Sequence, residues 1–94
     1  MRIVNESLAG TLESSDAVVR VSPHEELEVT VVSTVEAQFG AQIRALVAET
    51  LESLDVHAAR VVVEGKGALD CTLRARLQAA VLRAGDGEIE WSRL

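Results

Sequence analysis

The chain has 94 residues, 48% of them hydrophobic, and a formal net charge of −6 at pH 7. This composition argues against an intrinsically disordered chain, and the length predicts a single domain spanning residues 1–94. The acidic charge argues against nucleic-acid binding, which needs clustered Lys and Arg, and no stretch reaches the ~20 apolar residues of a membrane span. A single cysteine and an N-terminus without a long apolar run predict a cytoplasmic protein.

Two segments near the N-terminus are predicted to form a β-hairpin. Residues 8–13, Leu-Ala-Gly-Thr-Leu-Glu, alternate weakly, and residues 17–21, Ala-Val-Val-Arg-Val, are rich in the β-branched residues that favour strands. If these strands pair, residues 14–16, Ser-Ser-Asp, connect them and place Ser14 and Ser15 at the hairpin tip. Ser-Ser is a poor two-residue loop, because tight hairpin turns favour Gly or Asn.

Two further strands, and a candidate for a third, follow in the chain. Residues 27–31, Leu-Glu-Val-Thr-Val, alternate cleanly and predict a half-buried strand, which an acidic loop at residues 22–26 precedes. Residues 59–65, Ala-Arg-Val-Val-Val-Glu-Gly, form a continuous apolar run that is typical of a strand at the centre of a sheet. Residues 88–91, Glu-Ile-Glu-Trp, alternate again and are a candidate for a final short edge strand.

Two amphipathic helices are predicted between and after these strands. The first begins at a capping box, Ser-Thr-Val-Glu at residues 33–36, in which each end side chain satisfies a backbone N–H of the first turn. Its apolar stripe recurs at steps of three and four residues: Val35, Phe39, Ile43, Leu46, Val47, Leu51 and Leu54. The stripe of the second helix comprises Leu69, Leu73, Leu77, Val81 and Ala84.

The ends of the second helix carry their own signals. Asp70 is either its N-cap or a residue of its first turn, Arg83 lies in its last turn, and Gly85 suits the C′ position. The predicted order is therefore β-β-β-α-β-α, with or without the final short strand. Because both helices must bury their stripes, we expect an α+β fold, with a small, mostly antiparallel sheet of four or five strands and both helices packed on one face.

The sequence contains no recognisable catalytic or metal-binding motif. His24 lies in the acidic loop and His57 follows the first helix, and no ligand spacing suggests a zinc site. Cys71 begins the second helix, where thiols can be activated, but the neighbouring Asp70 opposes a thiolate and free cysteines are usually small core residues. We therefore expect neither a catalytic residue nor a metal site. The alternative is an enzyme that uses Ser14 or Cys71 as its nucleophile.

A locally basic segment interrupts this acidic chain. It contains Lys66, Arg74, Arg76 and Arg83, with only Asp70 as an acid among them. Our first interpretation is a solvated face with cations placed favourably towards the helix C-terminus. The alternative is a docking face for a partner protein or for phosphate groups.

Two stretches together resemble the citrate lyase acyl carrier protein (gamma chain) family. They are residues 8–16, Leu-Ala-Gly-Thr-Leu-Glu-Ser-Ser-Asp, and residues 66–84, which begin Lys-Gly-Ala-Leu-Asp-Cys. The Gln-Phe-Gly-Ala-Gln-Ile-Arg of residues 38–44 and the overall length fit the same family. The resemblance covers nearly the whole chain in order, except for the tail after Gly85.

The resemblance implies a covalent cofactor, 2′-(5″-phosphoribosyl)-3′-dephospho-coenzyme A, joined by a phosphodiester to Ser14. Ser15 matches a position where family members can carry glycine, so attachment there is not implied, and Glu13 and Asp16 are interpreted as solvated neighbours. The chain would be a non-catalytic carrier of the acetyl and citryl thioesters during cleavage of citrate to acetate and oxaloacetate.

The implied partners are the citrate lyase alpha subunit (acyl transferase), the beta subunit (lyase) and a prosthetic-group transferase, with neither nucleic acid nor membrane. The alternatives are a carrier of citramalate lyase or malonate decarboxylase, whose carrier bears the same kind of group, and a cofactor-free interaction module that docks through its basic second helix.

Overall fold

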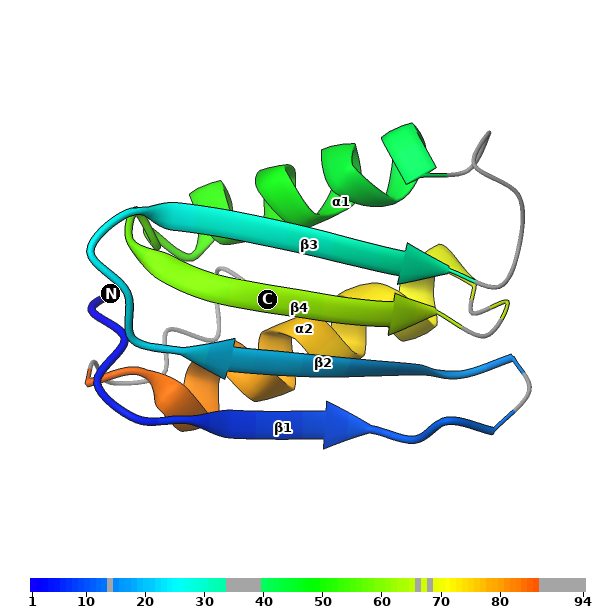
Figure 1. Ribbon diagram of the computed structural model, residues 1–94, viewed down its shortest axis with the longest axis horizontal. Coiled ribbons are helices and arrows are strands. Elements are labelled where there is room, and N and C mark those ends of the chain that lie inside the picture. Colours follow the sequence, from blue (N-terminus) through cyan, green and yellow to red (C-terminus); the bar gives the residue numbers. More distant parts are fainter. Residues whose placement is uncertain (14, 34–39, 66, 68, 87–94) are drawn as a thin grey trace.

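The computed structural model describes the whole chain except residues 14, 34–39, 66, 68 and 87–94 (Figure 1). In chain order, its elements are β1 (Ser7–Gly10), β2 (Ala17–Ser22), β3 (Leu27–Ser33), α1 (Gly40–Ser53), β4 (Ala59–Gly65) and α2 (Asp70–Ala84). This order confirms the predicted β-β-β-α-β-α succession. The candidate strand at residues 88–91 lies outside the described residues, as does most of the predicted capping box at residues 33–36.

The four strands form one sheet in the order β1-β2-β4-β3. β1 pairs with β2 and β2 with β4 in antiparallel fashion, whereas β3 and β4 are parallel. The sheet is therefore mixed, although most of its pairings are antiparallel as predicted. β4 lies between β2 and β3, which confirms the central position expected from its continuous apolar run. The connection from β3 to β4 runs through α1, and such a crossover joins parallel strands.

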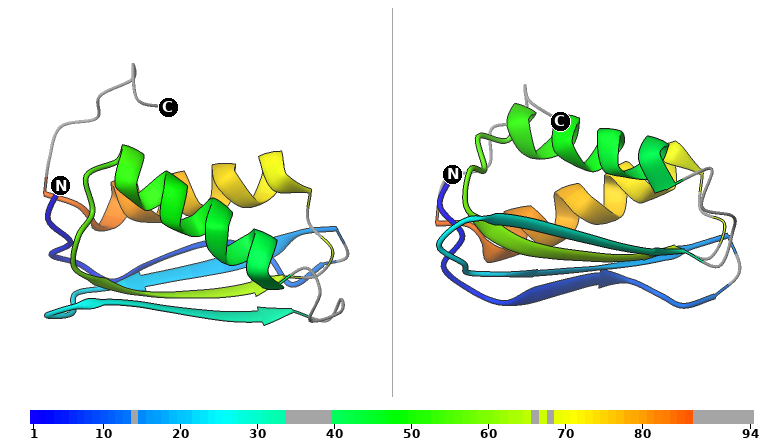
Figure 2. Two further views of the ribbon diagram at one scale, coloured as in Figure 1. Left: turned by 90° about the horizontal axis from the view of Figure 1, so that it is seen from above. Right: turned by 45° about the horizontal axis from the view of Figure 1, so that its top comes forward.

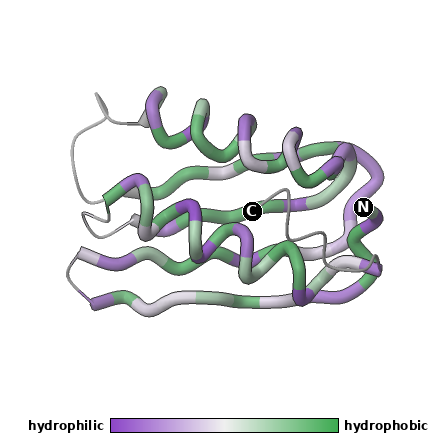
Figure 3. Tube along the Cα trace, turned by 180° about the vertical axis from the view of Figure 1, so that it is seen from behind, coloured by the Kyte–Doolittle hydropathy of each residue, from purple (hydrophilic) through white to green (hydrophobic). Residues whose placement is uncertain are grey.

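Both helices cover the same face of the sheet, which gives the two layers expected from their apolar stripes (Figure 2). Apolar residues follow the central strands and recur along both helices (Figure 3). The largest fully buried side chains of the core come from both layers and, in the case of Val56, from the connection between α1 and β4: Val19, Val21, Val47, Leu51, Val56, Val61, Val63, Leu77 and Val81. Complete burial of one such side chain contributes roughly 1.5–3 kcal/mol to folding. In the described part of the chain, neither helix is long and apolar enough to cross a membrane.

The stripe of α1 is confirmed over the residues that the structure describes. Leu46, Val47, Leu51 and Leu54 are buried, and Ile43 packs against the core at partial burial. The predicted stripe residues at positions 35 and 39 lie outside the described residues.

The stripe of α2 is confirmed at Leu73, Leu77, Val81 and Ala84, but its first member is wrong. Leu69 is the N-cap residue and is 70% exposed. Its extended backbone, with φ −70° and ψ 158°, turns the side chain away from the direction that helical geometry would give it. The helix begins at Asp70. This acid therefore lies in the first turn of α2 and is not its N-cap.

Gly85 follows α2, but its backbone is extended, with φ −82° and ψ 160°, rather than left-handed. Gly85 therefore does not adopt the left-handed conformation for which glycine is favoured at the C′ position. A different constraint acts here, because a Cβ at position 85 would collide with the side chain of Met1. The glycine permits close approach of the N-terminal segment, whose Val4 N–H donates to the carbonyl of Ala84 at 2.9 Å.

Candidate functional site

The serine implied as the attachment point belongs to the connection between β1 and β2, residues 11–16. Position 14 itself lies outside the described residues, while Thr11, Leu12, Glu13 and Ser15 around it are exposed. β1 and β2 pair as the predicted hairpin, with Gly10 opposite Val18 as the last pair. The loop is therefore longer than the predicted Ser-Ser-Asp connection. It protrudes at the end of the sheet where β1 finishes (Figure 1).

Two residues of this hairpin adopt backbone conformations that favour glycine. Gly10 ends β1 with φ +98°, and a Cβ there would collide with the carbonyl oxygen of Ala17. Ser15 has φ +63°, a left-handed conformation that residues other than glycine rarely adopt. The N–H of Asp16 donates to the carbonyl of Glu13 at 3.1 Å and closes a turn. Glycine adopts this backbone without steric strain, so the conformation at position 15 suits a glycine better than a serine.

Asp16 is the anchor of the loop rather than a solvated neighbour of the serines. It is only 9% exposed, and its carboxylate accepts hydrogen bonds from the Thr11 hydroxyl at 2.5 Å and the Ala17 N–H at 2.7 Å. From α2, the Arg76 guanidinium donates to both carboxylate oxygens, through Nε at 3.0 Å and Nη2 at 3.2 Å. A bidentate pair of this kind fixes orientation as well as distance. The interpretation of Asp16 as a solvated residue is therefore wrong.

The surroundings of Asp16 favour its ionised form. The hydrogen bonds from Arg76, from the Thr11 hydroxyl and from the Ala17 N–H hold the pKa of Asp16 well below its usual range, against the smaller opposing effect of burial. The same pair raises the pKa of Arg76. Both shifts favour the charged forms of the two groups, so the loop and α2 remain joined by opposite charges at neutral pH.

The basic segment of the second helix is mostly engaged within the molecule. Arg76 holds Asp16, and the Nη1 of Arg83 donates to the carbonyl of Leu8 on β1 at 3.2 Å. Arg74 is exposed, and the lysine at position 66 lies outside the described residues. The solvated-face interpretation is wrong for Arg76, which is half-buried and ties α2 to the hairpin, whereas Arg83 is exposed in the last turn of α2 as predicted and also contacts the hairpin. The feature of the sequence that could have indicated a structural role for Arg76 is its position next to the buried stripe of α2.

The other candidate residues are not assembled into a site. His24 lies in the β2–β3 loop, where its Nε2 is 3.4 Å from a Glu28 carboxylate oxygen, and His57 lies 3.3 Å from the Asp55 carboxylate. Cys71 is exposed, so the expectation of a core cysteine is wrong, because position 71 precedes the buried stripe of α2. Among the residues that the structure describes, no group of three or more His, Cys, Asp or Glu is arranged to hold a metal ion.

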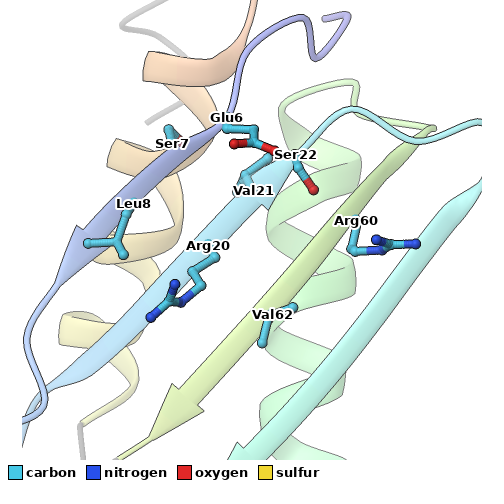
Figure 4. A pocket seen from close by; sticks show the side chains of 8 residues that line it. All are labelled: Glu6, Ser7, Leu8, Arg20, Val21, Ser22, Arg60 and Val62. Atoms are coloured by element: carbon cyan, nitrogen blue, oxygen red, sulfur yellow. The ribbon is translucent and has the colours of Figure 1, made fainter.

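A shallow cavity of about 510 Å³ lies on the sheet face that the helices leave uncovered (Figure 4). Arg20 extends from β2 towards β1, which carries Leu8, whereas Arg60 extends from β4 towards β3. Arg60 is paired with Glu28 at 3.5 Å. Among the described residues that line the cavity, none is a histidine or a cysteine.

Comparison with known proteins finds relatives over the whole chain. It is 54% identical to the citrate lyase acyl carrier protein of Enterobacter sp. (strain 638), over 100% of this chain and 99% of that protein. The protein of the same name from Haemophilus influenzae is 53% identical, over 97% and 96% of the two chains. A family model described as the malonate decarboxylase delta subunit (MdcD) matches residues 4–84.

A solved structure shares the fold. A chain in the crystal structure of a Pseudomonas malonate decarboxylase hetero-tetramer in complex with malonate matches with a TM-score of 0.76. The match covers 86% of this chain and 84% of that chain at 20% sequence identity. At this identity the likeness concerns the arrangement of strands and helices.

Proposed function

This chain belongs to the family of citrate lyase acyl carrier proteins, and we propose that it is the acyl carrier subunit of a citrate lyase complex. The full-length similarity to proteins of that name is the observation that carries the proposal. The chain is a non-catalytic subunit, so the bond-making steps belong to its partners. We place the carrier in one domain, residues 1–94, acting in the cytoplasm.

The proposed attachment point is Ser14, esterified with 2′-(5″-phosphoribosyl)-3′-dephospho-coenzyme A. The residues around it fit such a group, since Thr11, Leu12, Glu13 and Ser15 are all exposed. Ser15 is less suitable, because its left-handed backbone serves the turn. When bound, the group supplies the thiol on which acetyl and citryl groups are carried.

The protein's own contribution is to present the arm from a fixed base. Asp16 and Arg76 fasten one end of the loop to α2, and the pairing of Gly10 with Val18 fastens the other end to the sheet. An exposed, anchored loop allows an arm to visit several active sites while its base keeps one orientation. Tethering raises the effective concentration of the carried group at each partner, to about millimolar for a short flexible arm.

The proposed partners are the citrate lyase alpha subunit, which exchanges acyl groups, the beta subunit, which cleaves citrate, and the prosthetic-group transferase. A carrier of malonate decarboxylase is the second candidate, favoured by the matching family model and by the shared fold. The modified chain should restore citrate cleavage to purified alpha and beta subunits and should not restore malonate decarboxylation. The reverse result would favour the second candidate, and cleavage of citramalate alone would indicate the corresponding lyase.

The test of attachment is intact-mass spectrometry after co-expression with the attachment enzymes of citrate lyase. We expect one adduct that is lost in Ser14→Ala and retained in the matched variant Ser15→Ala. An adduct that persists in Ser14→Ala would contradict the assignment. Turnover by the unmodified chain that disappears in Cys71→Ala would favour a nucleophilic enzyme instead.

A further inference from the structure

The sheet face that the helices leave uncovered carries a row of neighbouring side chains across three strands. The strand register places Leu8 of β1 opposite Arg20 of β2, and Arg20 opposite Val62 of β4. Paired residues of antiparallel strands point to the same face with their Cβ atoms about 5 Å apart, so the three side chains are immediate neighbours. The row lines the shallow cavity of about 510 Å³, a volume in the range of small-molecule sites (Figure 4).

Arg20 is the cation of this cavity that is available to an outside anion. It is exposed and makes no ion pair or side-chain hydrogen bond with any described residue. Arg60, the other arginine of the lining, is 3.5 Å from a carboxylate oxygen of Glu28. Two further acids belong to this region, Glu6 in the lining and Glu64 one row along, and neither is within ion-pair distance of Arg20.

The side chains of the row match a ligand that joins a phosphate to an apolar or planar group. A guanidinium binds phosphate through two parallel N–H···O bonds, and its flat faces stack on planar rings. Leu8, which is 46% exposed, and the half-buried Val62 supply apolar contacts on either side of Arg20. The hydroxyl-bearing Ser22 lines the same cavity. This combination is suited to the phosphates and the base of a nucleotide.

We propose that this cavity, with Arg20 as its anion-binding side chain, is a resting site for the nucleotide part of the arm that Ser14 carries. The proposal rests on the attachment proposed above. Arg20 follows Ala17, where the loop at residues 11–16 ends, by three residues, so it lies about 10 Å along β2 from the loop. An arm held here stays against its own carrier between visits to the partner subunits.

The tether makes a weak site sufficient. A single exposed arginine adds little affinity for a free phosphate, because water and salt screen the charge. A short flexible tether, however, presents the carried group at an effective concentration of about millimolar. A site with a Kd of about 1 mM is then occupied about half of the time, and a partner subunit can still displace the arm.

The experiment compares NMR spectra of the isotope-labelled full chain with and without the attached group, and intact mass establishes the state of each sample. We expect the amide resonances of Leu8 and Val62 to shift on attachment, together with the side-chain Nε resonance of Arg20. The amide resonance of Leu77, which is buried on α2, should stay in place. In Arg20→Ala the shifts at Leu8 and Val62 should fall by more than about half. The matched control is Arg74→Ala, which removes an exposed cation from α2 and should leave both shifts unchanged.

Titration of the unmodified chain with free dephospho-coenzyme A tests the same cavity without the tether. We expect shifts at the same residues with a Kd of about 1 mM, weakened about fivefold in Arg20→Ala. Pantetheine, which has the thiol but no phosphate, should produce no such shifts. Equal shifts with pantetheine would overturn the recognition of phosphate.

Three further outcomes would overturn the resting site. Attachment shifts that are confined to residues 11–16, or that are unchanged in Arg20→Ala, would remove the arm or the arginine from the cavity. Absence of attachment shifts at Leu8 and Val62, with weakened binding of Arg20→Ala to the alpha or beta subunit, would assign this face to that subunit. A chain that accepts no group at Ser14 would refute the attachment as well, and the titration with dephospho-coenzyme A separates the two failures, since it needs no attachment.

Discussion

The loops at the two ends of β2 are held in different ways. In the loop before β2, residues 11–16, the Asp16 carboxylate is bound by Arg76, a residue sixty positions away on α2. In the loop after β2, the side-chain contacts are local, since the Nδ1 of His24 lies 2.9 Å from the carbonyl oxygen of Glu26 and its Nε2 approaches Glu28, four residues on. The first loop is therefore tied to the helical layer by a side chain, and the second is stabilised by its own neighbours.

This difference corresponds to what each loop must do. A loop that presents a hydroxyl to an enzyme needs a defined orientation, and a bidentate ion pair to a packed helix supplies one. A loop that only reverses the chain needs no such anchor. The contrast predicts that changes to the anchor formed by Asp16 and Arg76 will affect both folding and attachment, whereas equivalent changes around His24 will affect neither strongly.

Gly10→Ala should have the largest effect on stability, because it disturbs the backbone where the chain enters the anchored loop. The alanine would have to adopt φ +98°, and its Cβ would collide with the carbonyl oxygen of Ala17. Strain and overpacking together are expected to reduce the free energy of unfolding by about 3 kcal/mol or more. Urea denaturation followed by circular dichroism measures this loss.

Gly67→Ala is the matched control for that substitution. Gly67 has φ +81°, but a Cβ there meets no atom within 4 Å. We expect a loss of about 1–2 kcal/mol from the left-handed backbone alone. Equal losses in the two variants would show that contact with Ala17 does not constrain the hairpin.

Asp16→Asn should break the anchor while preserving the shape of the side chain. Arg76 would lose its ionised partner, and the loop would lose its fixed orientation. We expect kcat for attachment at Ser14 to fall roughly tenfold with KM nearly unchanged, because orientation rather than docking is affected. His24→Ala is the control from the other loop and should leave both constants within about twofold. A rise in KM alone in Asp16→Asn would indicate instead that the carboxylate contributes to binding of the attaching enzyme.

The anchor also has a defined pH dependence. The pKa of Asp16 is depressed in the folded chain relative to its ordinary value of 3.8, so its contribution to stability is fully present above that value. As the pH falls below about 3.8, the unfolded chain takes up a proton first and the contribution declines. The difference in unfolding free energy between the wild-type chain and Asp16→Asn should therefore be constant from pH 7 to pH 5 and shrink below pH 4. A difference that grows on acidification would contradict the ion pair.

Much of the fold could be predicted from the sequence, because it depends on short-range periodicity. The apolar run at residues 59–65 indicated a central strand, and the recurrence of Leu46, Val47 and Leu51 indicated the buried side of α1. Such patterns arise because alternate residues of a strand, and residues three or four apart in a helix, share a face. The turn at the serines was also located, although its length was underestimated.

The features that were missed depend on contacts between distant parts of the chain. Nothing near Asp16 in the sequence identifies Arg76 as its partner, and the close approach of Met1 to Gly85 is likewise a contact between distant residues. The orientation of Leu69 depends on where the first turn of α2 begins, which a periodic pattern leaves uncertain by a residue. The position of Ser14 in the loop follows from pattern, but its role comes from the family resemblance.

Ser15→Gly should have the smallest effect and should sharpen the distinction between the two serines. Glycine adopts φ +63° without the steric penalty of about 1–2 kcal/mol that a side chain imposes, although it also gains freedom in the unfolded chain. We expect a net stabilisation of about 0.5–1 kcal/mol by urea denaturation, with attachment at Ser14 unchanged. Ser15→Val is the matched opposite, because a β-branched residue disfavours this conformation and should destabilise the chain. If Ser15→Gly instead slowed attachment, the hydroxyl at position 15 would take part in recognition, and the loop would use both serines.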